Sequence, residues 1–141
     1  MKFKGEQNFQ HENEQKKGVL IAYLGTPDSP DVLSVRRYLK EFLSDPRIIE
    51  VPKIIWWFVL NIFILNFRSF NSARLYKSIW TDGGSPLLVN CIKIKEKVQK
   101  SLPSNYQVAL GMRYGNPSIK SALNELKEAN CRDIEVITLF P

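Results

Sequence analysis

The chain has 141 residues, which is enough for one domain with a buried core. Its hydrophobic content of 44% and aromatic content of 11% exclude an intrinsically disordered chain. The net charge of +6 suits an anionic ligand or an acidic membrane surface, whereas the scattered placement of the basic residues argues against a nucleic-acid partner.

The chain is expected to begin with a polar leader over residues 1–17, which is mixed in charge, has no hydrophobic period and is predicted to be disordered. It lacks the apolar core of a signal peptide. One domain is predicted over 18–141, and it starts with six consecutive apolar residues, Val19 to Leu24. Such a short run, closed at once by turn residues, indicates a strand that is buried on both faces. Ligands of open parallel sheets bind beyond the carboxyl ends of the strands, which places Leu24 at the expected site.

A helix is predicted after this strand. Asp28 or Ser29 can cap it, and Pro30 fits its first turn. Apolar residues that recur at helical spacing predict its buried face, namely Val32, Val35, Leu39 and Phe42. The sequence Ser-Asp-Pro at 44–46 is expected to end it.

Residues 54–67 are apolar except for two asparagines. Two interpretations are open: a core helix, or a lip helix whose outer face meets a membrane or a flat apolar ligand. Fourteen residues are too few to span a bilayer as a helix, which needs about 20. Trp56 and Trp57 are adjacent and cannot both point into one core, and tryptophan favours membrane interfaces. We therefore favour the lip, with Trp56, Trp57 and Phe58 as its contact residues.

Two glycines, Gly83 and Gly84, precede a second predicted helix, with Ser85 at its cap and Pro86 at its first position. A helix N-terminus beside two glycines can bind an anion, although an ordinary loop and cap is the more common arrangement. The helix is expected to bury a stripe of apolar residues, namely Leu87, Leu88, Cys91, Ile94, Val98 and Leu102.

Two more strands are predicted at 106–112 and 134–140, separated by a helix over 118–130. Strands that alternate with helices predict parallel pairing. The helix is expected to bury Ile119, Ala122, Leu123 and Leu126. Arg113 follows the second strand directly and should stand level with Leu24. An arginine there can bind a ligand or, more commonly, form a salt bridge.

The cysteines and the histidine do not form a recognisable catalytic or metal-binding set. Cys91 and Cys131 are far apart and lack a CxxC spacing, which predicts reduced thiols. The sole histidine, His11, lies in the leader. Three parallel strands would also leave two open sheet edges, so the chain is expected to be a piece of a larger fold.

Five sequence segments, in order along the chain, carry a resemblance to a known family. They are LGTPDSP at 24–30, VRRYLKEFLSDPRIIEVP at 35–52, SARLYKSIWTDGGSPL at 72–87, GMRYGNPSI at 111–119 and the closing ITLFP. Over 18–141 the chain resembles the N-terminal part of bacterial ferrochelatases, the enzymes that insert ferrous iron into protoporphyrin IX to make haem.

The resemblance implies an α/β fold: a Rossmann-like (chelatase-like) parallel sheet flanked by helices, here the incomplete first domain of a two-domain fold. The family holds the porphyrin in the cleft between its two domains, and an apolar lip, here 54–67, admits it from a membrane. Five residues match the family's porphyrin pocket, namely Leu24, Tyr76, Ser85, Arg113 and Tyr114. An arginine and a capped helix start suit the propionate carboxylates.

The family's metal-binding histidine and glutamate match nothing in this chain. We therefore expect no catalytic or metal-binding residue and no bound cofactor here, and little or no activity from the chain alone. The expected partners are protoporphyrin IX, a membrane surface, and a missing C-terminal domain or second chain, in the cytoplasm at the periphery of the inner membrane. A non-catalytic porphyrin-binding or carrier module is an open alternative. A nucleotide-binding Rossmann domain is disfavoured, because no GxGxxG follows the first strand.

Overall fold

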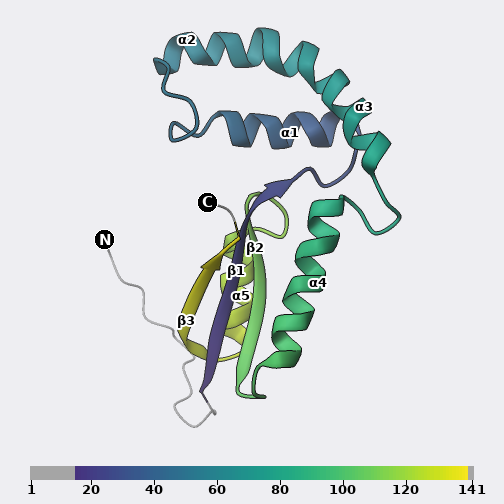
Figure 1. Ribbon diagram of the computed structural model, residues 1–141. Coiled ribbons are helices and arrows are strands. Elements are labelled where there is room, and N and C mark those ends of the chain that lie inside the picture. The colour runs from purple at the N-terminus through teal and green to yellow at the C-terminus, as the bar shows by residue number, and fades with distance from the viewer. Residues whose placement is uncertain (1–14, 140–141) are drawn as a thin grey trace.

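Three parallel strands form the sheet of the computed structural model, which describes residues 15–139 (Figure 1). The strands are β1 (Lys16–Thr26), β2 (Tyr106–Gly115) and β3 (Cys131–Thr138), in the order β2-β1-β3. The helices are α1 (Val32–Leu43), α2 (Lys53–Phe58), the π-helix η1 (Val59–Arg68), α3 (Ser69–Ile79), α4 (Pro86–Ser101) and α5 (Ile119–Glu128). The predicted α/β class with a parallel sheet between helices is confirmed.

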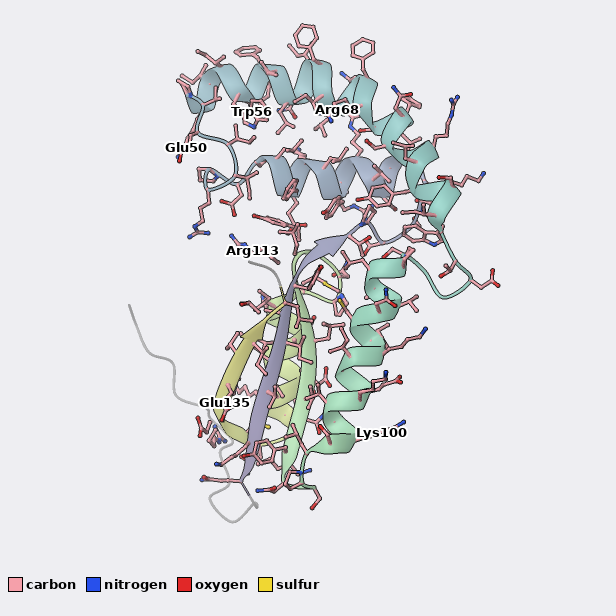
Figure 2. All side chains as sticks on the ribbon, in the orientation of Figure 1. Glu50, Trp56, Arg68, Lys100, Arg113 and Glu135 are labelled. Atoms are coloured by element: carbon pink, nitrogen blue, oxygen red, sulfur yellow. The ribbon has the colours of Figure 1, made fainter. Side chains whose placement is uncertain are left out.

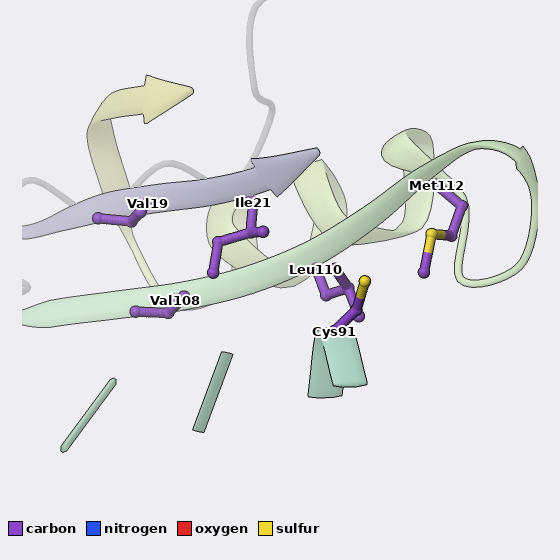
Figure 3. Close-up of a cluster of buried hydrophobic side chains, with 6 residues drawn as sticks. All are labelled: Val19, Ile21, Cys91, Val108, Leu110 and Met112. Carbon is purple, nitrogen blue, oxygen red and sulfur yellow. The ribbon is translucent and has the colours of Figure 1, made fainter. Parts of the chain in front are cut away.

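The core lies on both faces of β1, the central strand. Val19 and Ile21 pack with Val108 and Leu110 of β2 and with Cys91 of α4 (Figure 3). The alternate residues of the same strands face α5, where Leu20 and Ala109 pack with Ala122 and Leu126. The connection from β1 leads to β2 at one edge of the sheet, and the connection from β2 leads back across β1 to β3 at the other edge. Because both crossovers are right-handed and run in opposite directions, their helices lie on opposite faces of the sheet. Figure 1 shows α4 and α5 in these positions.

The strands differ from prediction at their ends. β1 begins at Lys16, two residues inside the expected leader, and residues 1–14 of that leader lie outside the described residues. β2 extends three residues further than expected, and β3 runs from Cys131 to Thr138 instead of over 134–140. Val136 and Ile137 of β3 are exposed, so the edge strand carries apolar side chains that this part of the fold leaves uncovered.

Two glycines allow β1 and β2 to stay paired to their carboxyl ends. Gly25 has a φ of +120°, and a Cβ on it would lie 1.8 Å from the carbonyl oxygen of Tyr114. Gly115 has a φ of +81°, and its Cβ would lie 2.5 Å from the carbonyl oxygen of Thr26. The turn residues that were predicted to close the strand after Leu24 therefore do not end it. Gly25 instead permits a close backbone approach inside the strand.

A layer of helices covers the carboxyl end of the sheet (Figure 1). α1 packs against η1 and α3, which continue α2 into one helical segment over 53–79. The predicted cap of α1 is wrong: Asp31, the residue just before the helix, accepts hydrogen bonds from the backbone of Leu33 and Ser34. Of the predicted buried face only Val35 is fully buried, and Tyr38 is buried beside it.

The cap of α4 is as predicted. The Ser85 hydroxyl accepts a 3.2 Å hydrogen bond from the Leu88 amide, and Pro86 is the first helical residue. Two positions expected to be buried, Ile94 and Leu123, are each 39% exposed. Next to Ile94 in α4, Lys95 is half-buried, and its ammonium group pairs with Glu125 of α5 at 3.1 Å.

Candidate functional site

The carboxyl ends of β1 and β2 bring two of the predicted site residues to the same level. Tyr23 pairs with Met112 and Gly25 with Tyr114, so Leu24 and Arg113 stand opposite each other in the register. Leu24 is half-buried, and the Arg113 side chain is 44% exposed. The expected convergence at this edge of the sheet is confirmed.

Asp45, in the loop after α1, joins that loop to the end of β2. Its Oδ2 accepts hydrogen bonds from Nη2 of Arg113 at 2.7 Å and from the hydroxyl of Tyr114 at 2.9 Å. Its Oδ1 accepts one from the backbone amide of Arg47 at 2.9 Å. The Arg47 amide and the Arg113 guanidinium lower the pKa of Asp45 to about 2, because both stabilise the ionised carboxylate. Of the two roles open for Arg113, the structure shows the salt bridge.

An open hollow of about 630 Å³ lies in front of these side chains, and we call it the basic hollow. Four basic residues line it against two acidic ones, namely Arg37, Lys40, Arg47 and Arg113 against Glu41 and Asp45. Figure 2 shows Arg113 between the sheet and the helical layer. The excess of positive charge favours an anion at this point.

A second hollow, of about 350 Å³, lies between the loop after α1 and the segment 53–79, and we call it the apolar hollow. Its apolar lining consists of Leu43, Pro46, Val51, Trp56, Trp57 and Leu60. The two hollows share the residues at the end of α1 and just beyond it, namely Lys40, Ser44, Asp45 and Pro46. A ligand with an apolar body and an anionic group could therefore occupy both.

The two adjacent tryptophans lie in different environments, as their position in the sequence predicted. Trp56 is half-buried, and its indole nitrogen donates a 2.6 Å hydrogen bond to the carbonyl oxygen of Leu43 (Figure 2). Trp57 is 58% exposed and meets Phe58 edge to face. Trp56 is thus an anchor for the helix, whereas Trp57 and Phe58 are available for contact.

The segment 53–79 buries one row of side chains and exposes another. Leu60, Leu65 and Ala73 are buried. On the outside, large apolar side chains form what we call the lip face, which includes Ile54, Trp57, Phe58, Phe63, Phe67 and Phe70. Figure 2 shows aromatic side chains projecting from this segment away from α1. The segment therefore has a buried row, as a core helix requires, and an exposed apolar row, as a lip requires; contact of that row with a membrane or a ligand stays a prediction.

The continuous helix also changes the length argument. The prediction considered only 54–67, but the helical segment runs unbroken from Lys53 to Ile79. By length and composition alone it could cross a membrane, a test that the core helix of a soluble protein also passes.

The other predicted site residues lie outside both hollows. Tyr76, in α3, is half-buried and meets the rings of Tyr38 and Trp80 edge to face at 6.5 and 6.3 Å. Ser85 is 2% exposed and its hydroxyl oxygen serves as the cap of α4. The structure therefore brings Arg113 and Tyr114 together in one hollow and Trp56 and Trp57 in the other, while Leu24, Tyr76 and Ser85 line neither.

Sequence reasoning missed Asp45 and Lys40. The Ser-Asp-Pro sequence was interpreted only as the end of a helix, and Lys40 was given no role. Within residues 15–139, no group of three or more His, Cys, Asp or Glu side chains is arranged to hold a metal ion.

Comparison with known proteins gives one family. The family model described as "Ferrochelatase" matches residues 16–141. The chain is 48% identical to a ferrochelatase of Alcanivorax borkumensis over 100% of its own length and 42% of that protein. It is 52% identical to one of Coxiella burnetii over 92% of this chain and 36% of the relative. It is 47% identical to a ferrochelatase of Thioalkalivibrio sulfidiphilus over 100% of this chain and 39% of that relative. The chain thus spans about two-fifths of the length of these relatives.

Proposed function

The chain belongs to the ferrochelatase family, and from this premise we propose that it supplies the porphyrin-binding part of an enzyme that inserts ferrous iron into protoporphyrin IX. The observation that carries the proposal is the basic hollow, with Arg113 and Tyr114 at its wall, directly beside the apolar hollow. Protoporphyrin IX is a flat apolar macrocycle with two carboxylates. It therefore needs both kinds of surface side by side.

In this proposal each hollow has its own role in binding. The apolar hollow, with Trp56 and Trp57 at its wall, takes the edge of the macrocycle. The cationic groups of Lys40 and Arg113 attract the carboxylates, because charge-assisted hydrogen bonds are stronger than neutral ones. Leu24, Tyr76 and Ser85 stay candidates through the family match alone.

Iron insertion itself requires bending of the macrocycle and removal of two pyrrole protons. The resemblance assigns these steps, and the binding of the substrate iron, to a histidine and a glutamate that match no residue of this chain. We therefore propose that residues 1–141 alone bind and orient the porphyrin but do not insert iron. A rate above the uncatalysed one from the purified chain would refute this.

The lip face supports contact with a membrane surface. Protoporphyrin IX is poorly soluble, and an apolar helix face beside the apolar hollow would let it pass from lipid into the site. Exposed aromatic side chains such as Trp57 and Phe58 are suited to the membrane interface.

The direct test is a titration of protoporphyrin IX with the purified chain, followed by porphyrin fluorescence. We expect saturable binding that Arg113→Ala weakens about tenfold, through loss of a charge-assisted contact. Arg36→Ala, on the same helix as Lys40 but outside the basic hollow, is the matched control and should bind as the wild type does. Absence of saturable binding, or equal losses in both variants, would contradict the proposal.

A carrier without catalytic function would bind porphyrin equally well. The two are separated by adding, in trans, the remaining C-terminal part of the Alcanivorax borkumensis relative. Recovery of iron insertion favours the enzyme, and binding without recovery favours the carrier. Saturable binding of a dinucleotide would instead revive the nucleotide-binding alternative.

A further inference from the structure

Three carboxylates tie α1 and its flanking loops to the end of β2. Asp28 accepts a 3.0 Å hydrogen bond from the side-chain amide of Asn116, and Glu41 accepts one of the same length from the backbone amide of Gly115. Asp45 accepts from Arg113 and from Tyr114. Of these three carboxylates, only Asp45 bonds to candidate porphyrin-binding side chains.

We propose that Asp45 is a positioning residue for ligand binding in the basic hollow: its Oδ2 holds the Arg113 guanidinium and the Tyr114 hydroxyl in the orientation that receives the ligand. This inference rests on the proposed function, because it assumes that the hollow binds porphyrin. It assigns to the loop after α1 a role that neither its sequence nor the family match supplied.

Arg113 is held by two neighbouring side chains although its own side chain is 44% exposed. Its Nη2 is bonded to Asp45, and its guanidinium carbon lies 5.4 Å from the centre of the Tyr114 ring. That ring meets Phe42 edge to face at 5.2 Å. The Asp45 side chain is only 8% exposed, whereas the side chains of Arg37 and Arg47 on the same hollow are 72% and 79% exposed. Asp45 is thus the rigid element of the hollow.

Rigidity of this kind favours binding because a side chain already held in place loses less conformational entropy when the ligand arrives. The Tyr114 hydroxyl donates its proton to Asp45 and also interacts with the Arg113 guanidinium, so the three side chains form one hydrogen-bonded network. Arg113 uses one of its five N–H groups on Asp45 and can direct others toward the hollow.

The direction in which Asp45→Asn changes ligand binding distinguishes a positioning role of Asp45 from a purely electrostatic one. Asp45 is one of only two acidic residues that line the hollow, so neutralising it makes the hollow more positive. If Asp45 acted only through its charge, Asp45→Asn would strengthen the binding of a dicarboxylate. If Asp45 positions Arg113 and Tyr114, the same substitution weakens binding in spite of the gain in positive charge.

The experiment measures the Kd for protoporphyrin IX of the wild type, Asp45→Asn, Arg113→Ala and the double variant. We expect Asp45→Asn to bind about tenfold more weakly and to add little in the Arg113→Ala background, since contacting residues are coupled. Asp28→Asn is the matched control: it also removes one carboxylate charge between α1 and β2, and it should bind as tightly as the wild type or slightly more tightly. Unchanged or tighter binding by Asp45→Asn, or an equal loss in both backgrounds, would overturn the proposal.

A second readout needs no ligand. Burial and the hydrogen bond to Asp45 raise the pKa of Tyr114. Carbon-13 labelling of the tyrosine Cζ atoms allows this pKa to be followed by NMR, with the resonance assigned by Tyr114→Phe. Asp45→Asn should lower it and Asp28→Asn should leave it unchanged, and a Tyr114 pKa unaffected by Asp45→Asn would overturn the positioning role. A wild-type chain that binds no porphyrin would instead overturn the proposed function, and with it the role of Asp45 in binding, even if the Tyr114 titration upheld the contact.

Discussion

The indole nitrogen of Trp56 donates a 2.6 Å hydrogen bond to the carbonyl oxygen of Leu43, the last residue of α1. Carbonyl groups in the last turn of a helix have no partner inside that helix, so this bond satisfies one of them and ties the segment 53–79 to α1 at the same time. Trp57, the next residue, points outward. Two neighbouring tryptophans therefore lie in different environments: Trp56 ties two helices together, and Trp57 is exposed.

The first prediction follows from this difference. Trp56→Phe keeps an aromatic ring but removes the donor, and should lower the free energy of unfolding by about 1 kcal/mol or more. Trp57→Phe should change it by less than about 0.5 kcal/mol, as for other exposed sites. Urea unfolding of both variants measures the difference. Equal stabilities would mean that the Trp56 hydrogen bond is not an anchor.

The second prediction concerns the lip face. Phe63→Ser together with Phe67→Ser should reduce co-sedimentation with phosphatidylethanolamine and phosphatidylglycerol vesicles at least about tenfold, because each exposed phenylalanine that enters lipid contributes about 1.5–3 kcal/mol. The matched control is Ile94→Ser with Leu123→Ser, which removes two apolar side chains exposed on α4 and α5. Substituting both tryptophans is a less clean test, since Trp56 also anchors the helix. Unchanged sedimentation of the double phenylalanine variant would count against the lip.

The third prediction concerns the strand ends beneath the site. Gly25→Ala should destabilise the fold by about 3 kcal/mol or more, since its Cβ would lie inside the backbone of β2 at a φ that alanine rarely adopts. Gly83→Ala is the comparison, because the nearest atom to its Cβ is a valine methyl group at 3.2 Å and that contact can relax. Thermal unfolding of both variants tests this, and similar melting temperatures would show that the close approach of β1 to β2 is not required.

The fourth prediction is a pH dependence of stability. The pKa of Asp45 is lowered to about 2 in the folded chain, from an ordinary value of about 3.9. Because the folded pKa is the lower one, the carboxylate stabilises the fold above about pH 4, and this contribution is lost as the pH falls toward 2. Wild type should therefore exceed Asp45→Asn in stability at pH 5–6, and the gap should close in acid. Urea titrations between pH 2 and 6 measure it, and a gap that does not vary with pH would exclude the carboxylate charge as its cause.

Local patterns in the sequence predicted the elements well where short-range physics decides them. Six apolar residues in a row at 19–24 indicated a doubly buried strand, and Ser85 with Pro86 marked the start of α4. Local signals failed where several residues compete for one role. Asp31, rather than Asp28 or Ser29, caps α1, because the chain path into the helix decides which side chain reaches the free amides.

The sequence by itself therefore determined the order of strands and helices, the parallel sheet and, through its five matching segments, the family. Only the tertiary structure decided which side chains form the candidate site. Asp45 and Arg113 are 68 residues apart, and nothing in the local sequence of either names the other. Their contact exists because the carboxyl end of β2 and the loop after α1 meet at one edge of the sheet. That meeting depends on close backbone approach at Gly25 and on the packing of α1 over the strand ends, which are properties of the whole fold.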